Sequence, residues 1–440
     1  MGRRMMSLFL LAGAFMAVMH LGQGTRDGNL SPTLILGFLL LGAYCVGFLT
    51  WRLGFPWITG YIIAGLLMGP HVFGWIPLNA LNDLRFLNSL ALAFIAFSAG
   101  GELRLNCIRD RFKSILFLTT GVALVVFLGV SMTIYFLTPH LLFSQGWNPA
   151  TRLLVSAIFG VIAVARSPSS TIAIICETRA KGSYTDTSLS VTVATDVLII
   201  MLFAVVVSIG ETALFQGKAL RFGFFFQLLL EIGSAFLLGF LLAKAIVFLI
   251  RNLKVEFPVV IAGMGFLVIK FSHLLGEYLQ EAYRIGLDLE PLLICMAAGF
   301  TVQNFSKHGE QFLAEMESVS LPIYVSFFAF TGATIDLKTL ESAWLLGLVL
   351  VVSRAILMFV GANVSGRLAG DDRRIYANVW MAFITQAGVS LGLLTEVVRR
   401  FPEFGLEIQS ILISAITINQ VIGPVLFKMG LKRVGEIPKM

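Results

Sequence analysis

Apolar residues occur along this chain in long runs separated by short polar connections. Fourteen runs approach the twenty residues that a helix needs to cross a bilayer. Because the runs have helical length and lack the alternation of an outer-membrane barrel, we expect an all-α polytopic membrane protein whose helices satisfy their own backbone polar groups. The runs lie at about residues 5–19, 32–51, 55–75, 87–105, 114–137, 152–176, 187–209, 223–250, 257–275, 290–305, 318–335, 341–363, 376–398 and 408–427.

The first run is shorter than the others. It spans about 22 Å at 1.5 Å per residue, and it follows Arg3 and Arg4, which is typical of a secretory signal. A retained helix fits the same pattern, and both leave the later runs in one orientation. We therefore predict 13 core transmembrane helices, preceded within residues 1–30 by a signal-like segment or an extra helix.

Basic residues predict how the chain is oriented. When successive loops are assigned to alternate sides of the membrane, 19 Lys and Arg residues lie on one side and 9 on the other. Loops rich in Lys and Arg stay in the cytoplasm. We therefore expect a multi-pass protein of the cell (inner) membrane with a cytoplasmic C-terminus.

Composition excludes other classes of protein. With 57% hydrophobic and 13% charged residues over 440 positions, the chain exceeds what one soluble core could bury. The net charge of +7 comes from basic residues scattered between apolar runs, so it indicates topology and no nucleic-acid partner. The four cysteines lack metal-like spacing. We expect no enzyme and no cofactor, and any soluble regulatory subunit should be a separate chain.

Two short motifs recur at nearly one offset. Ala64-Gly65 is matched 234 positions later by Ala298-Gly299, and Ala96-Phe97-Ser98 is matched 233 positions later by Ala329-Phe330-Thr331. The members of each pair are seven runs apart. An odd number of membrane crossings reverses the orientation of the chain, so the two copies of each motif should point in opposite directions across the membrane. An inverted repeat of this kind is typical of secondary transporters. We predict a first repeat at residues 31–222, a linker helix at 223–250, a second repeat at 251–431 and a cytoplasmic tail at 432–440.

Transporters with inverted repeats carry interrupted helices in corresponding positions. The segment GVIAVARSPSSTIAII (residues 160–175) contains Pro168, which removes a backbone donor and disfavours helix at Ser167. Its counterpart MAFITQAGVSLGLL (residues 381–394) contains the polar stretch 385–388. We predict that both helices break near the midplane. A proline kink bridged by serine hydroxyls and close glycine packing are the respective alternatives.

Three ionisable residues lie deep within apolar runs: Arg166, Asp196 and Arg354. A charge at the bilayer centre costs at least ~2.5 to 3.5 kcal/mol, so such residues usually face a water-filled path or one another. Thr192 precedes Asp196 by four residues and shares its helical face, and Thr195 adjoins it. With Ser169 and Ser170 they offer hard oxygen ligands for a small alkali cation. A permanent ion pair between Asp196 and either arginine is the alternative.

These segments resemble the monovalent cation:proton antiporters, nearer the bacterial branch that includes potassium-efflux antiporters. The resemblance runs from about residue 34 to 431 and depends on the order of four motifs. It implies inverted six-helix repeats, a core domain with crossed broken helices, and a dimerisation domain that holds a homodimer. The motifs are AFSAGGELRL, ARSPSSTIAII with the following ATDVL, FFAFTGATIDL and ITQAGVSLGLL.

The resemblance also implies roles for individual residues. Asp196 becomes the shared carrier of a monovalent cation and a proton, and Arg354 a structural cation. The two broken helices would cross at Ser169, Ser170 and Thr171 on one helix and at residues 385–388 on the other. Among these, the candidate cation ligands are Ser169, Ser170, Thr171 and Gln386.

Two positions depart from the pattern of this family. Thr195 stands where electrogenic members have a second aspartate, which predicts electroneutral exchange of one cation per proton. Val191 stands where a glutamate often pairs with an arginine like Arg354, so the resemblance names no partner for Arg354. Arg166 is then a candidate counter-charge for Asp196 when no cation is bound.

We therefore predict an antiporter that exchanges Na⁺ or K⁺ for H⁺ by alternating access. A sodium-coupled symporter of organic anions with a related fold, and a sensor or channel-like subunit without transport, are the alternatives. The second predicted crossing offers only Thr385, Gln386 and Ser390 as polar side chains, which favours an ion over an organic substrate.

Overall fold

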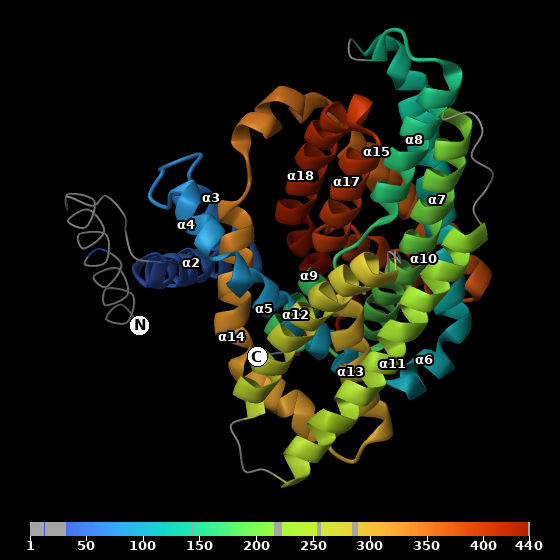
Figure 1. Cartoon of the computed structure of the whole chain (residues 1–440). Coiled ribbons are helices and arrows are strands. Elements are labelled where there is room, and N and C mark those ends of the chain that lie inside the picture. Colours follow the sequence, from blue (N-terminus) through green and yellow to red (C-terminus); the bar gives the residue numbers. More distant parts are fainter. Residues whose placement is uncertain are drawn as a thin grey trace. The chain divides into compact units, whose positions relative to one another are not determined.

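The computed structural model describes Gly13 and residues 32–141, 144–214, 222–252, 257–283 and 289–438 (Figure 1). Within these ranges the regular structure is helical, and they contain no strand. The signal-like segment expected in residues 1–30 lies outside the described residues, apart from Gly13.

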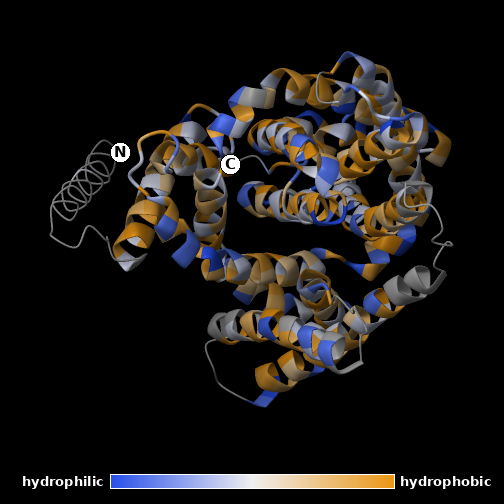
Figure 2. Ribbon diagram, turned by 45° about the horizontal axis from the view of Figure 1, so that its top comes forward, coloured by the Kyte–Doolittle hydropathy of each residue, from blue (hydrophilic) through white to orange (hydrophobic). Residues whose placement is uncertain are grey.

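Long apolar helices dominate the described part of the chain. Eight spans are long and apolar enough to cross a membrane, and one of these, Pro149–Thr178, comprises two helices, α8 and α9. The bent pair Arg373–Phe383 and Gly388–Arg400 makes a ninth if it is counted as one span. Two further apolar helices, α3 (Trp57–Met68) and α13 (Pro291–Phe305), are shorter. Hydrophobic residues predominate along the ribbons in Figure 2. The all-α membrane architecture is confirmed, whereas the count of 13 spans stays a prediction.

The described helices form two compact units. One contains the described residues up to Glu102 together with Gly239–Leu275 and Pro291–Leu337. The other contains Leu103–Leu238, Gly276–Glu290 and the described residues from Lys338 onward. Each unit therefore draws helices from both predicted repeats.

The first unit contains α3, α13 and four more complete helices, together with parts of α11 (Phe222–Asn252) and α12 (Phe257–Tyr283). Its core is aromatic and aliphatic, with Phe94, Phe97 and Phe312 fully shielded from solvent. The other complete helices are α2 (Pro32–Arg52), α4 (Leu78–Asp83), α5 (Arg85–Glu102) and α14 (Gly309–Ala333).

The recurring motifs meet each other in this unit. Gly65 on α3 lies against the carbonyl oxygen of Ala329 on α14, where any Cβ would collide with it. Gly299 on α13 lies in the same way against the carbonyl oxygen of Phe97 on α5. Only glycine allows helix backbones to approach this closely. Each Ala-Gly motif thus packs on the Ala-Phe motif from the other half of the chain.

The second unit contains the segments with candidate chemistry. Four long helices form its frame, and short helices connect them. The long helices are α7 (Phe112–Leu137), α10 (Ser183–Leu214), α15 (Leu337–Ala369) and α18 (Pro402–Val434), and the short elements are α6 (Leu105–Asp110), η1 (Thr138–His140), α8 (Pro149–Val164), α9 (Pro168–Thr178), α16 (Arg373–Tyr376), η3 (Val379–Phe383) and α17 (Gly388–Arg400).

Helix α15 shows how this unit separates its surface from its interior. Leu345, Val352 and Ile356 are exposed on one side of the helix, as expected for a face in contact with lipid. Val351, Arg354 and Met358 are buried on the other side. The helical repeat therefore turns Arg354 inward although most of its neighbours are apolar.

Candidate functional site

The first predicted break is present. Helix α8 ends at Val164, residues 165–167 are not helical, and α9 begins at Pro168. Proline suits the first helical position because it has no N–H to leave unpaired. The Ser167 hydroxyl accepts a hydrogen bond from the Ser170 backbone N–H at 3.3 Å. The serines therefore cap a new helix and do not bridge a continuous one.

The second predicted break is also present. Residues 384–387 are not helical, and the segments on either side are bent by 49°. A Cβ added at Gly388 would meet nothing within 4 Å. Close helix packing therefore does not explain this glycine.

Arg354 joins the two breaks. Its guanidinium donates to the carbonyl oxygens of Ala163 and Ala165 at 2.7 Å each, beside the first break. It also donates to Phe383 and Ile384 at 3.0 and 2.6 Å, beside the second. The side chain is 2% exposed. Unwound backbone leaves carbonyls without helical partners, and Arg354 satisfies four of them. Its hydrogen-bond partners in the described structure are backbone carbonyls, whereas the resemblance named no partner for this arginine.

Gln386 forms a second connection between the breaks. Its Nε2 donates to the carbonyl oxygen of Ile162 at 2.8 Å, and its Oε1 accepts from Asn419 Nδ2 on α18 at 2.8 Å. Asn419 is 1% exposed. Sequence reasoning missed this residue, although an Asn-Gln pair inside the apolar run of α18 is a signal that can be recognised.

Asp196 lies on α10, which packs against α8, α9 and η3. The residue is partly exposed, but its Oδ1 atom is inaccessible and has no hydrogen-bond partner in the described structure. A buried carboxylate oxygen without a partner is costly. It therefore has free capacity to accept a cation or a proton.

The two threonines near Asp196 are buried within α10. The hydroxyl of Thr192 donates to Ser188 O at 2.7 Å, and that of Thr195 donates to Val191 O at 2.6 Å. Each hydroxyl oxygen has two lone pairs, which these bonds leave available as acceptors. The threonines can therefore offer oxygen to a ligand without losing their bonds to the helix.

Arg166 lies in the first break and is 1% exposed. Its guanidinium carbon is 3.8 Å from the centroid of the Phe383 ring. None of its three side-chain nitrogens has a hydrogen-bond partner in the described structure. Its charge interacts with that of Asp196, but no ion pair within 4.0 Å joins Asp196 to an arginine among the described residues. The permanent ion pair considered above is therefore not formed here.

The remaining candidate ligands lie at the start of α9. The Ser169 and Ser167 hydroxyls are 3.0 Å apart, and the Ser170 hydroxyl is 3.1 Å from that of Ser167. Thr171 donates to the carbonyl oxygen of Ser167 at 3.1 Å. All four residues are buried. They form one cluster of hydroxyls at the N-terminus of a half-helix.

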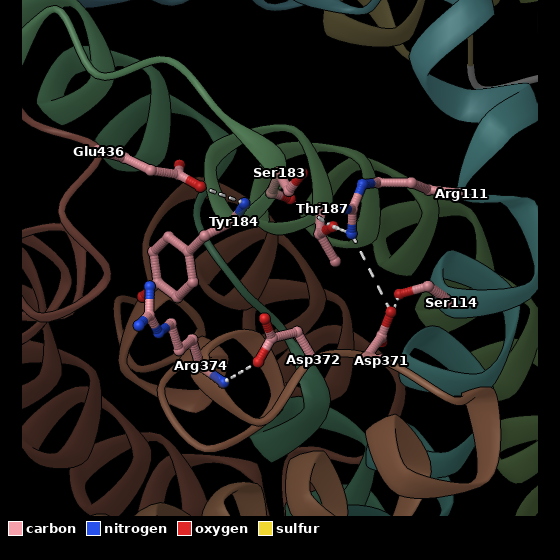
Figure 3. A network of polar contacts seen from close by, with 9 residues as sticks. All are labelled: Arg111, Ser114, Ser183, Tyr184, Thr187, Asp371, Asp372, Arg374 and Glu436. Atoms are coloured by element: carbon pink, nitrogen blue, oxygen red, sulfur yellow. Dashed lines mark hydrogen bonds and ion pairs between the residues drawn. The ribbon is translucent and has the colours of Figure 1, made fainter.

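A second polar cluster in the same unit holds the start of α10 (Figure 3). The Glu436 carboxylate accepts from the backbone N–H groups of Tyr184 and Thr185 at 2.7 and 2.8 Å, and from the Thr185 hydroxyl at 2.6 Å. The Tyr184 hydroxyl donates to the carbonyl oxygen of Asn378 at 3.2 Å. Glu436 thereby caps the helix that carries Asp196.

The same cluster connects α10 to α7 and to the end of α15. Arg111 Nη1 donates to the Thr187 hydroxyl at 3.2 Å and lies 4.0 Å from Asp371 Oδ1. Ser114 donates to Asp371 Oδ2 at 2.6 Å (Figure 3). These contacts hold together the ends of three long helices.

Comparison with known proteins gives one consistent result. Residues 35–431 match the family model described as "Sodium/hydrogen exchanger, transmembrane". The Na(+)/H(+)-K(+) antiporter GerN of Bacillus cereus is 24% identical over 366 residues, which cover 81% of this chain and 85% of GerN. A Na(+)/H(+) antiporter of Enterococcus hirae is 21% identical over 407 residues, which cover 91% of this chain and 98% of that protein.

Solved structures show the same fold. The sodium proton antiporter MjNhaP1 from Methanocaldococcus jannaschii, in a structure at pH 8, has a TM-score of 0.65 and 19% identity, with 91% of this chain and 96% of that chain covered. An electron microscopy map of MjNhaP1 gives a TM-score of 0.73 and 18% identity, with 92% and 98% covered. At this level of identity the likeness shows the fold alone.

Proposed function

The chain belongs to the sodium/hydrogen exchanger family, and we propose that it is a secondary active antiporter that exchanges Na⁺ or K⁺ for H⁺ by alternating access. The names of its relatives support both ions, since GerN is a Na(+)/H(+)-K(+) antiporter and the Enterococcus hirae protein is a Na(+)/H(+) antiporter. The excess of Lys and Arg in alternate loops supports insertion in the cell (inner) membrane with a cytoplasmic C-terminus.

One observation carries this proposal: the Asp196 carboxylate has a buried oxygen without a hydrogen-bond partner among the described residues, on a helix packed against both interrupted segments. A cation and a proton compete for the same carboxylate, so binding of one releases the other. That competition couples the two fluxes without a second ionisable site. Asp196 is the shared carrier in this mechanism.

The surrounding oxygen atoms complete the proposed cation site. Thr192 and Thr195 lie on α10, and the hydroxyl cluster Ser169, Ser170 and Thr171 lies at the start of α9. Gln386 at the second break is the remaining proposed ligand, although its Oε1 already accepts from Asn419. Arg354 has a structural role, since its donors satisfy carbonyls at both breaks.

We also propose that residues 31–222 and 251–431 are inverted repeats joined by α11. The reciprocal packing of Gly65 on Ala329 and of Gly299 on Phe97 supports this relation. The unit that contains Asp196 and both breaks is then the transport core. The other unit is the dimerisation domain of a homodimer.

Exchange in proteoliposomes tests the proposal. Lumenal pH is followed with a trapped dye while Na⁺, K⁺ or Li⁺ is added outside, first with the wild-type chain and then with Asp196→Asn. We expect cation-driven proton movement in the wild type and none in the variant. Asp186→Asn makes the same change ten residues earlier on α10 and should retain exchange. Absence of cation-driven proton movement in the wild type would contradict the proposal and favour a non-transporting sensor. An Asp196→Asn variant as active as the wild type would show that Asp196 is not the carrier.

A further inference from the structure

The Phe383 ring has no role in the mechanism described so far, yet the Arg166 guanidinium carbon lies 3.8 Å from its centroid. We infer that Phe383 holds Arg166 away from Asp196, and that Arg166 alternates between the Phe383 ring and the Asp196 carboxylate. Phe383 is then a positioning residue that sets the apparent affinity for the transported cation. The inference rests on the proposed function, because it takes Asp196 as the carrier.

The Arg166 guanidinium makes a cation–π contact with Phe383. Its central carbon lies over the ring, 3.8 Å from the ring centroid. Such a contact uses no acceptor atom, so the N–H donors of the guanidinium stay available to bind an anion. The three nitrogens of Arg166 are indeed without partners in the described structure.

The Phe383 ring is a fixed platform. Its side chain is fully buried, and its carbonyl oxygen accepts from Arg354 Nη2 at 3.0 Å. The next carbonyl, of Ile384, accepts from Arg354 Nη1 at 2.6 Å. Arg354 therefore anchors the backbone on which the ring is carried. With its donors directed at four carbonyls, Arg354 is not available to neutralise Asp196.

Arg166 and Asp196 both have buried polar atoms whose hydrogen bonds are not satisfied. Within the described residues the guanidinium nitrogens have no acceptor, and the Asp196 Oδ1 atom has no donor. Both are inaccessible to solvent, so neither is compensated by bulk water. Their charges interact through space, and Arg166 has rotatable bonds on a non-helical segment. Pairing would satisfy both groups at the loss of the aromatic contact.

The two positions of Arg166 have opposite effects on binding. When Arg166 pairs with Asp196, it occupies the carboxylate as a tethered cation and competes with Na⁺ or K⁺. When Arg166 lies on the Phe383 ring, the carboxylate is open to the transported ion. A cation bound at Asp196 removes the attraction for Arg166, which returns to the ring. The strength of the aromatic contact therefore determines how well the ion competes.

Two substitutions should change the apparent KM for the cation in opposite directions. Arg166→Gln removes the competitor, and we expect the KM to fall roughly threefold to tenfold. Phe383→Leu removes the platform and shifts Arg166 toward Asp196, and we expect the KM to rise by a similar factor, which lies within the range that one cation–π contact accounts for. Phe427→Leu makes the same change at a buried ring that packs near Tyr184, and should leave the KM unchanged.

The double variant Arg166→Gln/Phe383→Leu separates this role from simple packing. If Phe383 acts through Arg166, the double variant should have the KM of Arg166→Gln alone. Phe383→Tyr retains the ring face and should stay close to the wild type. All rates are measured in proteoliposomes at one pH, as initial rates over a series of cation concentrations. Should Phe383→Leu fail to fold, Phe383→Met fills a similar volume without a ring and carries the same expectation.

Several outcomes would overturn the inference. Unchanged KM values in Arg166→Gln and Phe383→Leu, shifts in the same direction, or independent shifts that add in the double variant would each show that Phe383 does not act through Arg166. These outcomes require a wild-type chain that exchanges cations for protons and loses this activity in Asp196→Asn. Failure of that exchange would instead contradict the proposed function itself.

Discussion

Asn419 on α18 donates through its Nδ2 atom to Gln386 Oε1 at the second break, at a distance of 2.8 Å. This contact fixes the orientation of the Gln386 amide, so that its Nε2 atom faces the carbonyl oxygen of Ile162 at 2.8 Å. An asparagine outside both interrupted helices thus determines how the second break is connected to α8.

Loss of the Asn419 side chain should weaken this connection. Asn419→Ala leaves the buried Oε1 of Gln386 without a donor, which costs about 1 to 3 kcal/mol of stability, and frees the amide to rotate. We expect a lower midpoint of thermal unfolding in detergent and a several-fold slower exchange. Asn363→Ala on α15 removes a partly exposed asparagine whose side chain donates to the carbonyl oxygen of Phe359 in its own helix, and should change neither. Equal behaviour of the two variants would mean that Gln386 needs no support from α18.

Arg354 should not be replaceable by lysine. An ammonium group is a single point and cannot donate to four carbonyls on two segments as the fork of the guanidinium does. Each buried carbonyl left unsatisfied costs about 1 to 3 kcal/mol. We therefore expect Arg354→Lys to lower the free energy of unfolding by on the order of 3 kcal/mol and to abolish most of the exchange activity.

The matched control for this change is Arg367→Lys, an exposed position near the end of the same helix. It should unfold at the wild-type temperature. A folded Arg354→Lys variant with wild-type exchange would show that the carbonyls find other partners, such as water, and that the arginine is not needed to hold the breaks.

The positions of both breaks were predictable from the sequence, because their causes are local. Pro168 lacks an N–H and excludes helix before it, and residues 385–388 combine polar side chains with glycine. The inaccessible Oδ1 atom of Asp196 agrees with the same local reasoning, since a carboxylate in an apolar run is costly in contact with lipid.

The partners of the arginines were not predictable in this way. Arg354 bonds to backbone carbonyls, which every residue possesses, so no sequence pattern identifies Ala163 or Phe383 as acceptors. The stacking of Arg166 on Phe383 joins residues 217 positions apart in the chain. Such contacts depend on how α8 and η3 are packed in three dimensions, and one sequence does not encode that packing in a readable form.

Glu436 should contribute to the stability of α10. Its carboxylate accepts from two backbone N–H groups in the first turn of the helix and from the Thr185 hydroxyl. Losing an N-terminal cap costs about 0.5 to 2 kcal/mol, so Glu436→Ala should lower the midpoint of thermal unfolding. Glu407→Ala on α18 removes an exposed glutamate and serves as the control. A Glu436→Ala variant as stable as Glu407→Ala would show that water caps the helix equally well.

Thr195 tests the stoichiometry of exchange most directly. It is fully buried beside Asp196, and its hydroxyl donates to Val191 O. With one carboxylate, a bound cation and a bound proton carry the same charge, so the wild-type rate should not respond to an imposed membrane potential. Thr195→Asp adds a second ionisable group that can release a second proton per cation, and each net charge moved through 100 mV is driven by about 2.3 kcal/mol. We therefore expect the initial rate of Thr195→Asp to depend on the potential, and that of Thr195→Asn, which adds a polar group without charge, to remain independent of it.

A wild-type rate that changes with potential would contradict one-for-one exchange. A folded, active Thr195→Asp variant that ignores the potential would show that charge at this position does not enter the transport cycle.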